Sequence, residues 1–319
     1  MPTTRSAGFD DRGDPVAAGN MAMLNPAHLI ADALGEELVR IYRDIFGDRE
    51  PDYASIARTA AKLVVERIAN SDALYHDSDH TVMVTLVGQA IFRGRILVEE
   101  LREVDWLHFT GALLFHDIGY LRGICPGDAE DVFVINEQGD TVRAPRGASD
   151  AFLTPYHIER GKLFTPYHIE RGKLFVRHRC KHIALLDAER IARAIELTRF
   201  PVPKDNDHAE TDTEPGLVRA TDLIGQLADP FYPRKLNALY HEFAETGVAE
   251  QLGYKSPADV AEHYPGFFWE KVEPYIRDAL QHLSRTVEGK QWIANLYAHV
   301  FVEEHARWRL GPQRGNPHT

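Results

Sequence analysis

Cysteine is scarce in this sequence, and long apolar runs are absent. Cys125 and Cys180 are the only cysteines in 319 residues, too few for a disulfide framework. No stretch approaches the roughly 18 continuous apolar residues that span a bilayer, and residues 1–20 contain no apolar segment of the signal-peptide type. We therefore expect a soluble, cytoplasmic protein that does not enter a membrane.

Positive charge is also in short supply. Lysine and arginine number 36 against 48 acidic residues, which gives a formal net charge of −12. A broad surface for a nucleic-acid polymer or an anionic membrane needs an excess of positive charge, so we expect neither partner. A small anionic substrate can still bind in a locally basic pocket. Glycine-rich phosphate loops, Gly-x-Ser-x-Gly and Cys-x-x-Cys motifs are absent too.

Apolar residues at helical spacing dominate what is present. Asn25 and Pro26 suit an N-cap and a first helical position, and helical patterns recur from there nearly to the C-terminus. With 44% hydrophobic residues the chain can bury a large core, and no domain linker interrupts it. We predict one all-α domain over residues 25–309, with a disordered N-terminal tail at 1–24 and a C-terminal tail at 310–319.

Two features interrupt the helical pattern. Residues 131–135 and 141–143 flank a Glu-Gln-Gly-Asp turn, so we predict a small β-hairpin, which is either a flap beside the functional site or an ordinary surface excursion. Residues 154–164 and 165–175 are identical and read Thr-Pro-Tyr-His-Ile-Glu-Arg-Gly-Lys-Leu-Phe. Eleven residues make about three helical turns. A helix can absorb the extra copy, or one copy loops out, and only one copy can occupy the original place.

The chain is organised around an apolar run over residues 113–120 that contains the doublet His116 and Asp117. Burying two titratable groups there is costly unless something compensates, and a divalent cation is the usual compensation. His80 begins the preceding predicted helix, and antiparallel packing brings that start near the doublet. Asp222 lies within another apolar helix. These imidazoles and carboxylates suit one or two Fe, Mn, Zn, Co or Mg ions.

In order and local context, these four residues resemble the H…HD…D signature of the HD-domain superfamily of all-helical, metal-dependent phosphohydrolases. The resemblance covers roughly residues 54–227 and implies an HD-domain, phosphodiesterase-like helical bundle with its metal core there, continued by helices over 228–309. Residues 75–80, Tyr-His-Asp-Ser-Asp-His, also resemble the Tyr-His-Asn-x-x-His motif of class I cyclic-nucleotide phosphodiesterases. That likeness implies that His76 is the general acid, the alternative being a plain surface histidine.

The duplicated segment offers further site residues. Many HD proteins hold a second metal with additional histidines between the doublet and the last aspartate. The resemblance therefore makes His157 or His168 a candidate fifth ligand, unless they are ordinary helix-surface residues. Arg177 and the two Glu-Arg-Gly-Lys segments supply positive charge for a substrate phosphate, the alternative being ordinary solvated side chains.

The sequence thus predicts metal-dependent hydrolysis of a phosphate ester of a nucleotide or similar small molecule. A metal-activated water attacks phosphorus, and His76 protonates the leaving oxygen. Two alternatives stay open: an HD-type di-iron oxygenase, and a non-catalytic HD module that binds a nucleotide. A homo-oligomer is compatible with the sequence, which does not fix the oligomeric state.

Overall fold

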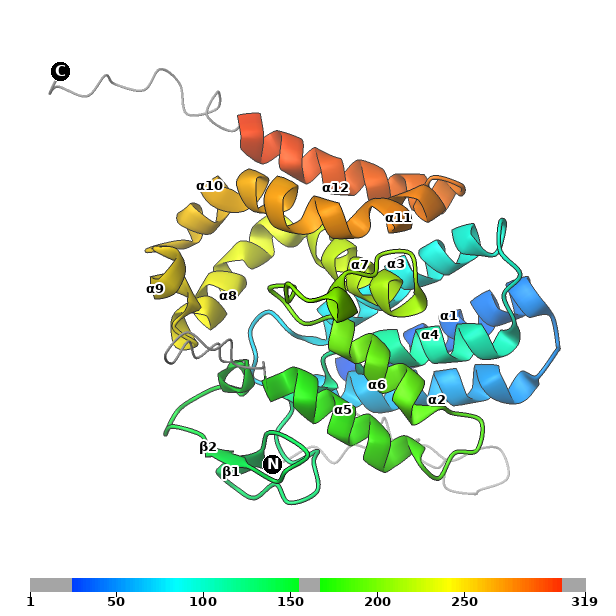
Figure 1. Ribbon diagram of the computed structural model, residues 1–319, viewed down its shortest axis with the longest axis horizontal. Coiled ribbons are helices and arrows are strands. Elements are labelled where there is room, and N and C mark those ends of the chain that lie inside the picture. Colours follow the sequence, from blue (N-terminus) through cyan, green and yellow to red (C-terminus); the bar gives the residue numbers. More distant parts are fainter. Residues whose placement is uncertain (1–24, 155–166, 306–319) are drawn as a thin grey trace, which may run out of the picture.

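The computed structural model describes residues 25–154 and 167–305, which form a bundle of helices with one small hairpin (Figure 1). The tails predicted at 1–24 and 310–319 lie outside the described residues. The α-helices are α1 (Pro26–Phe46), α2 (Pro51–Ile68), α3 (Ser78–Arg95), α4 (Glu103–Phe115), α5 (Tyr167–Cys180), α6 (Ala188–Leu197), α7 (Glu214–Leu227), α8 (Tyr232–Glu245), α9 (Val248–Leu252), α10 (Pro257–Phe267), α11 (Glu273–Leu283) and α12 (Val287–His305). The shorter elements are the strands β1 (Val132–Val134) and β2 (Thr141–Arg143), the 3-10 turns η1 (Ile118–Tyr120), η2 (Asp150–Leu153) and η3 (Asn206–His208), and the π turn η4 (Phe268–Val272).

The prediction of an all-α fold with a small hairpin is confirmed. Asn25 caps α1 by accepting the backbone N–H of Ala27, and Pro26 takes the first helical position. The two strands pair antiparallel, with Phe133 opposite Val142. Within the described ranges, no helix combines the length and the apolar character needed to cross a bilayer.

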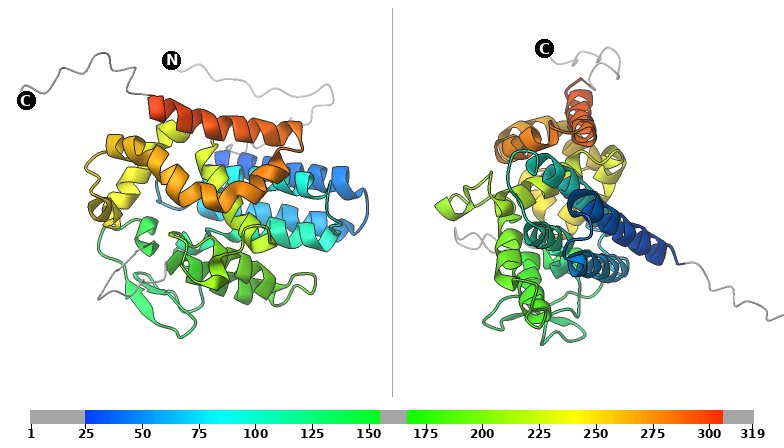
Figure 2. Two further views of the ribbon diagram at one scale, coloured as in Figure 1. Left: turned by 45° about the horizontal axis from the view of Figure 1, so that its top comes forward. Right: turned by 90° about the vertical axis from the view of Figure 1, so that its right-hand side faces the viewer.

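A continuous apolar core runs through the bundle, and α4 lies at its centre. Every residue from Trp106 to Phe115 is buried, because α2, α3, α6 and α7 all pack against this helix. A helix that is covered on all sides is apolar all round, which explains the unbroken apolar run before the doublet. Figure 2 shows α11 and α12 along one side of the bundle and α5 and α6 along the opposite side.

Two glycines allow the close helix contacts that position the doublet and its neighbours. A Cβ atom on Gly119 would lie 1.8 Å from the backbone oxygen of His168, so α5 can pack on the turn after the doublet only if this residue is glycine. A Cβ atom on Gly225 would lie 2.8 Å from the Cα atom of Val84. The second contact brings α7, which carries Asp222, against α3.

The second copy of the duplicated segment supplies the start of α5. Tyr167 is the first helical residue, and the helix continues without interruption into the unique sequence after Phe175. The first copy lies outside the described residues except for Thr154. The second copy therefore occupies the packed position beside the doublet.

Candidate metal centre

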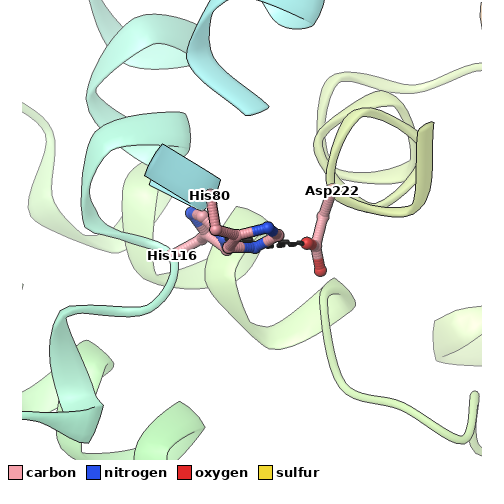
Figure 3. Close-up of side chains that lie close together, drawn as sticks. All are labelled: His80, His116 and Asp222. Carbon is pink, nitrogen blue, oxygen red and sulfur yellow. Dashed lines mark hydrogen bonds and ion pairs between the residues drawn. The ribbon is translucent and has the colours of Figure 1, made fainter. Parts of the chain in front are cut away.

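Three helices bring His80, His116 and Asp222 together (Figure 3). His80 lies in the first turn of α3, where the N-cap Asp77 accepts its backbone N–H at 3.0 Å. His116 directly follows α4, and Asp222 faces both imidazoles from α7. One ligand atom from each of the three lies within 4.8 Å of the other two.

Asp117 completes the group, which we call the His/Asp cluster: His80, His116, Asp117 and Asp222. The Oδ2 atom of Asp117 is 3.3 Å from His80 Nε2 and 3.1 Å from His116 Nε2. The Oδ1 atom of Asp222 is 3.3 Å from His80 Nε2 and 3.7 Å from His116 Nε2. The two Nε2 atoms are themselves 3.3 Å apart. The structure therefore brings together all four residues that the sequence proposed as ligands.

The hydrogen bond of His116 aims its ring into the cluster. Its Nδ1 atom is 2.7 Å from the backbone carbonyl oxygen of Leu113, which can only accept. Nδ1 therefore carries the proton, and the neutral ring has its lone pair on Nε2, the atom that faces the carboxylates. The ring is fully buried.

The spacing and the donor types of the cluster fit a divalent ion. Donor atoms about 2.1 Å from a common ion lie about 3.0–3.4 Å apart in octahedral or tetrahedral geometry, close to the separations observed here. Asp117 Oδ2 is buried and makes no well-oriented hydrogen bond within the described residues, although both imidazoles are near. A buried carboxylate oxygen in this state suits a cation, and imidazole with carboxylate suits Mn, Fe, Zn, Co or Mg.

The electrostatics of the cluster also favour positive charge. Burial alone lowers the pKa of His80, but the close carboxylates of Asp117 and Asp222 raise it to about 9. Burial likewise lowers the pKa of His116, and the close carboxylate of Asp117, followed by the charge of Asp222, raises it to about 9. Protons and a metal ion therefore compete for the same two Nε2 atoms.

His76 lies beside the cluster and is held by a residue that the sequence reasoning missed. Its Nδ1 atom is 2.6 Å from Glu242 Oε2, and Glu242 Oε1 accepts the backbone N–H groups of Tyr75 at 2.6 Å and His76 at 3.2 Å. Burial lowers the pKa of His76, but the charge and hydrogen bond of Glu242 raise it above its ordinary value. The ring of His76 is 5.6 Å from that of His80, centroid to centroid.

Tyr120 is stacked between two imidazoles next to the cluster. Its ring centroid is 4.5 Å from that of His76 and 4.3 Å from that of His168. Burial lowers the pKa of His168 to about 3, so its ring is neutral, and its buried Nδ1 has no hydrogen-bond partner among the described residues. His168 is thus the copy that lies near the doublet, and His157 lies outside the described residues.

Arg171, in the second copy, is neither a free phosphate-binding residue nor a solvated one. Its side chain is fully buried and pairs with Asp128, with Nη1 and Nη2 at 3.0 and 2.9 Å from the two carboxylate oxygens. It also donates to the backbone carbonyls of Gly119, Leu121 and Val134 at 2.6–2.9 Å. We call this arrangement the Arg171 clamp. It ties the hairpin to the turn after the doublet, so the hairpin is anchored beside the cluster.

Arg177 is not brought to the His/Asp cluster. It lies nine residues after His168 on α5, about 13 Å along the helix axis. Its guanidinium binds both carboxylate oxygens of Glu189, at 2.7 and 2.8 Å, and also contacts Glu137 in the hairpin turn. The sequence assigned this residue to a substrate phosphate, and its neighbours in the structure are these two carboxylates.

Comparison with known proteins gives one family match. The profile of the Npun_R2479-like family matches residues 24–165 and, as a second segment, residues 164–306. The two segments meet where the first copy of the duplicated sequence ends and the second begins. Searches of curated proteins and of solved structures gave no significant match. Because the two matched segments span most of the chain, the protein belongs to the Npun_R2479-like family.

Proposed function

We propose that this protein is a metal-dependent phosphohydrolase that cleaves a phosphate ester of a nucleotide or a similar small molecule. The observation that carries the proposal is the convergence of the His/Asp cluster from three helices, with donor atoms spaced for one ion. The order of these residues in the chain, which resembles that of the HD-domain superfamily, adds support. The chain belongs to the Npun_R2479-like family, and the activity is our inference from the site.

The cluster would hold a divalent ion through the Nε2 atoms of His80 and His116 and the carboxylates of Asp117 and Asp222. When bound, such an ion polarises a phosphoryl oxygen and makes a nearby water more acidic. The protein's own contribution is to fix the donors: the Leu113 carbonyl orients His116, and burial excludes competing solvent. His168, neutral and adjacent, is the candidate for an additional ligand among the described residues.

His76 is the candidate for the proton donor to the leaving oxygen. Glu242 accepts its Nδ1–H, and its Nε2 atom, which lies 3.4 Å from the Tyr120 hydroxyl, is the atom that would donate to the substrate. Stacking on Tyr120 restricts the ring from one side, and His80 lies on the neighbouring turn. A positioned histidine acid contributes a rate factor of roughly 10²–10⁴.

Metal analysis followed by an anaerobic phosphatase and phosphodiesterase screen tests the proposal. We expect the purified protein to bind a divalent ion and to release product in the presence of Mn, Mg, Fe or Co. The variant His116→Ala should lose both the ion and the activity. Full metal retention in His116→Ala and Asp117→Ala would contradict the assignment of the site.

Two other outcomes would contradict the reaction. An oxygen-dependent product with two irons per chain would identify an oxygenase. Nucleotide-induced thermal stabilisation without turnover, across the whole panel of metals, would identify a binding module.

A further inference from the structure

A groove lies between the hairpin and the end of α5, away from the His/Asp cluster. Its volume is about 600 Å³, within the range of small-molecule sites. Val134 and Leu174 form apolar parts of its lining. No member of the His/Asp cluster lines it, and Arg177, which does, lies about 13 Å along α5 from His168.

Basic side chains from one wall face into this groove. Arg177, His178 and Lys181 belong to its lining, and Glu137 is the acidic residue among the lining side chains. His178 and Lys181 form no ion pair with the acidic residues of the described chain, and both are exposed. The lining thus carries two cations, Arg177 and Lys181, against the single carboxylate of Glu137, in a chain whose formal net charge is −12, and a local excess of positive charge attracts anions.

At one edge of the Arg177 guanidinium, the present partner can be replaced by another anion. Glu189 binds Nε and Nη2, whereas Nη1 contacts Glu137 in the hairpin turn. The Glu137 side chain is 52% exposed, and an exposed ion pair contributes only about 0–1 kcal/mol. An anion carrying more than one negative charge can therefore replace the Glu137 carboxylate at Nη1, the atom of the guanidinium that Glu189 does not contact.

We propose that this groove binds a phosphorylated small molecule at a site separate from the metal centre. Arg177 Nη1 and Lys181 contact the phosphate, His178 adds a further donor, and Val134 and Leu174 contact the organic part. Phosphate suits this arrangement because it accepts hydrogen bonds from several cationic donors at once. The proposal does not depend on the reaction at the His/Asp cluster.

Calorimetric titration of the full-length variant His116→Ala with ADP, in the presence of EDTA, tests this site without a contribution from a bound metal. Adenosine is the uncharged control probe. We expect ADP to bind and adenosine not to bind. Adding Arg177→Ala should weaken ADP binding at least about tenfold, equivalent to about 1.4 kcal/mol, and Lys181→Ala should weaken it several-fold. Glu137→Gln should strengthen it, because the competing carboxylate is gone.

Arg179→Ala is the matched control. Arg179 lies in the same helical turn and carries the same charge, but its guanidinium lies over the ring of Phe175 and does not line the groove. Its replacement should leave ADP affinity unchanged. No ADP binding, or equal losses in Arg177→Ala and Arg179→Ala, would overturn the proposal. Lys181→Ala guards against misfolding, because Lys181 is exposed and forms no ion pair with another described residue.

Discussion

Two buried charged groups flank the turn that follows α4. They differ in whether hydrogen bonds within the chain satisfy them. In the Arg171 clamp, all the N–H donors of the guanidinium are used within the chain, on Asp128 and on three backbone carbonyls. In the His/Asp cluster, two imidazole nitrogens face one another at 3.3 Å, and a buried carboxylate oxygen makes no well-oriented hydrogen bond to a described residue.

This difference separates a structural role from a binding role. Buried polar groups are almost always hydrogen-bonded, and each exception needs an explanation. The clamp needs nothing from outside the chain, so its contribution is to hold the hairpin and the turn after the doublet together. The cluster brings donors together without satisfying them, as expected for a site that binds an ion.

The cluster should be indispensable for activity and less important for folding. Replacing His116 with Ala removes a proposed metal donor, and losing several kcal/mol of transition-state stabilisation should lower the rate by at least about 10³-fold. Metal content and kcat measured on the same preparation check this expectation. The unfolding free energy of the metal-free protein should change less than it does in Arg171→Ala.

His108 is the matched control for this prediction. It lies two turns earlier on α4, and both of its ring nitrogens are satisfied: Nδ1 by the Val104 carbonyl and Nε2 by the Asp187 N–H, each at 2.7 Å. His108→Ala should therefore destabilise the fold while metal binding remains. If His108→Ala removes the metal as completely as His116→Ala, the contrast between satisfied and unsatisfied groups fails.

His76 should affect the rate without affecting the metal. His76→Ala should lower kcat roughly 10²–10⁴-fold, with metal content unchanged. Glu242→Gln keeps the shape of the side chain but removes the charge that orients and stabilises His76, so we expect a smaller fall in kcat and little change in KM. Loss of the metal in His76→Ala would show that this histidine is a ligand.

The clamp should matter for stability, and the duplication supplies its own control. Arg171→Ala leaves Asp128 buried without its partner, which typically costs about 3–5 kcal/mol. Arg160 has identical sequence neighbours in the first copy, but Arg171 already fills the clamp. Arg160→Ala should therefore change the unfolding free energy by less than about 0.5 kcal/mol. Denaturant unfolding of both variants decides the matter, and equal losses would show that the two copies exchange places.

The helices and the His/Asp cluster could be predicted because each leaves a local trace in the sequence. Apolar periodicity marks the helices, and the ligands are polar residues set into apolar runs, as His116 and Asp222 show. The proximity of His80 to the doublet could be predicted from chain order, since His80 begins one helix of an antiparallel pair and the doublet ends the other.

The remaining parts of the site depend on contacts between distant segments. Glu242 is 166 positions from His76, and the only trace of its role is a carboxylate that follows Leu236 and Leu239 on the buried face of α8. From the sequence, Arg171 was a candidate for binding phosphate or for a solvated position, because its partner Asp128 lies 43 positions away, in the loop before β1. Arg177 carries the same kind of local signal, yet it lies at the other end of α5 from His168.

A third charged group, around Glu196, should make the unfolding free energy depend on pH. Burial raises the pKa of Glu196, but hydrogen bonds and charges from Arg199 and then Lys173 lower it from about 4.5 to about 2. A lowered pKa contributes stability that is present above the unfolded value and is lost as pH falls toward 2. With allowance for partial solvent exposure, we expect about 2 kcal/mol of the unfolding free energy to disappear between pH 5 and pH 2.

The matched comparison for this group is Glu189, which pairs with Arg177 but has a side chain that is 69% exposed. Glu196→Gln should flatten the pH dependence of the unfolding free energy below pH 5, because the variant has no carboxylate there to protonate. Glu189→Gln should leave that dependence nearly unchanged, since water already screens its ion pair. Identical pH profiles for the two variants would show that burial does not strengthen the Glu196 pairs, and that only the Arg171 clamp stabilises the fold through a satisfied buried charge.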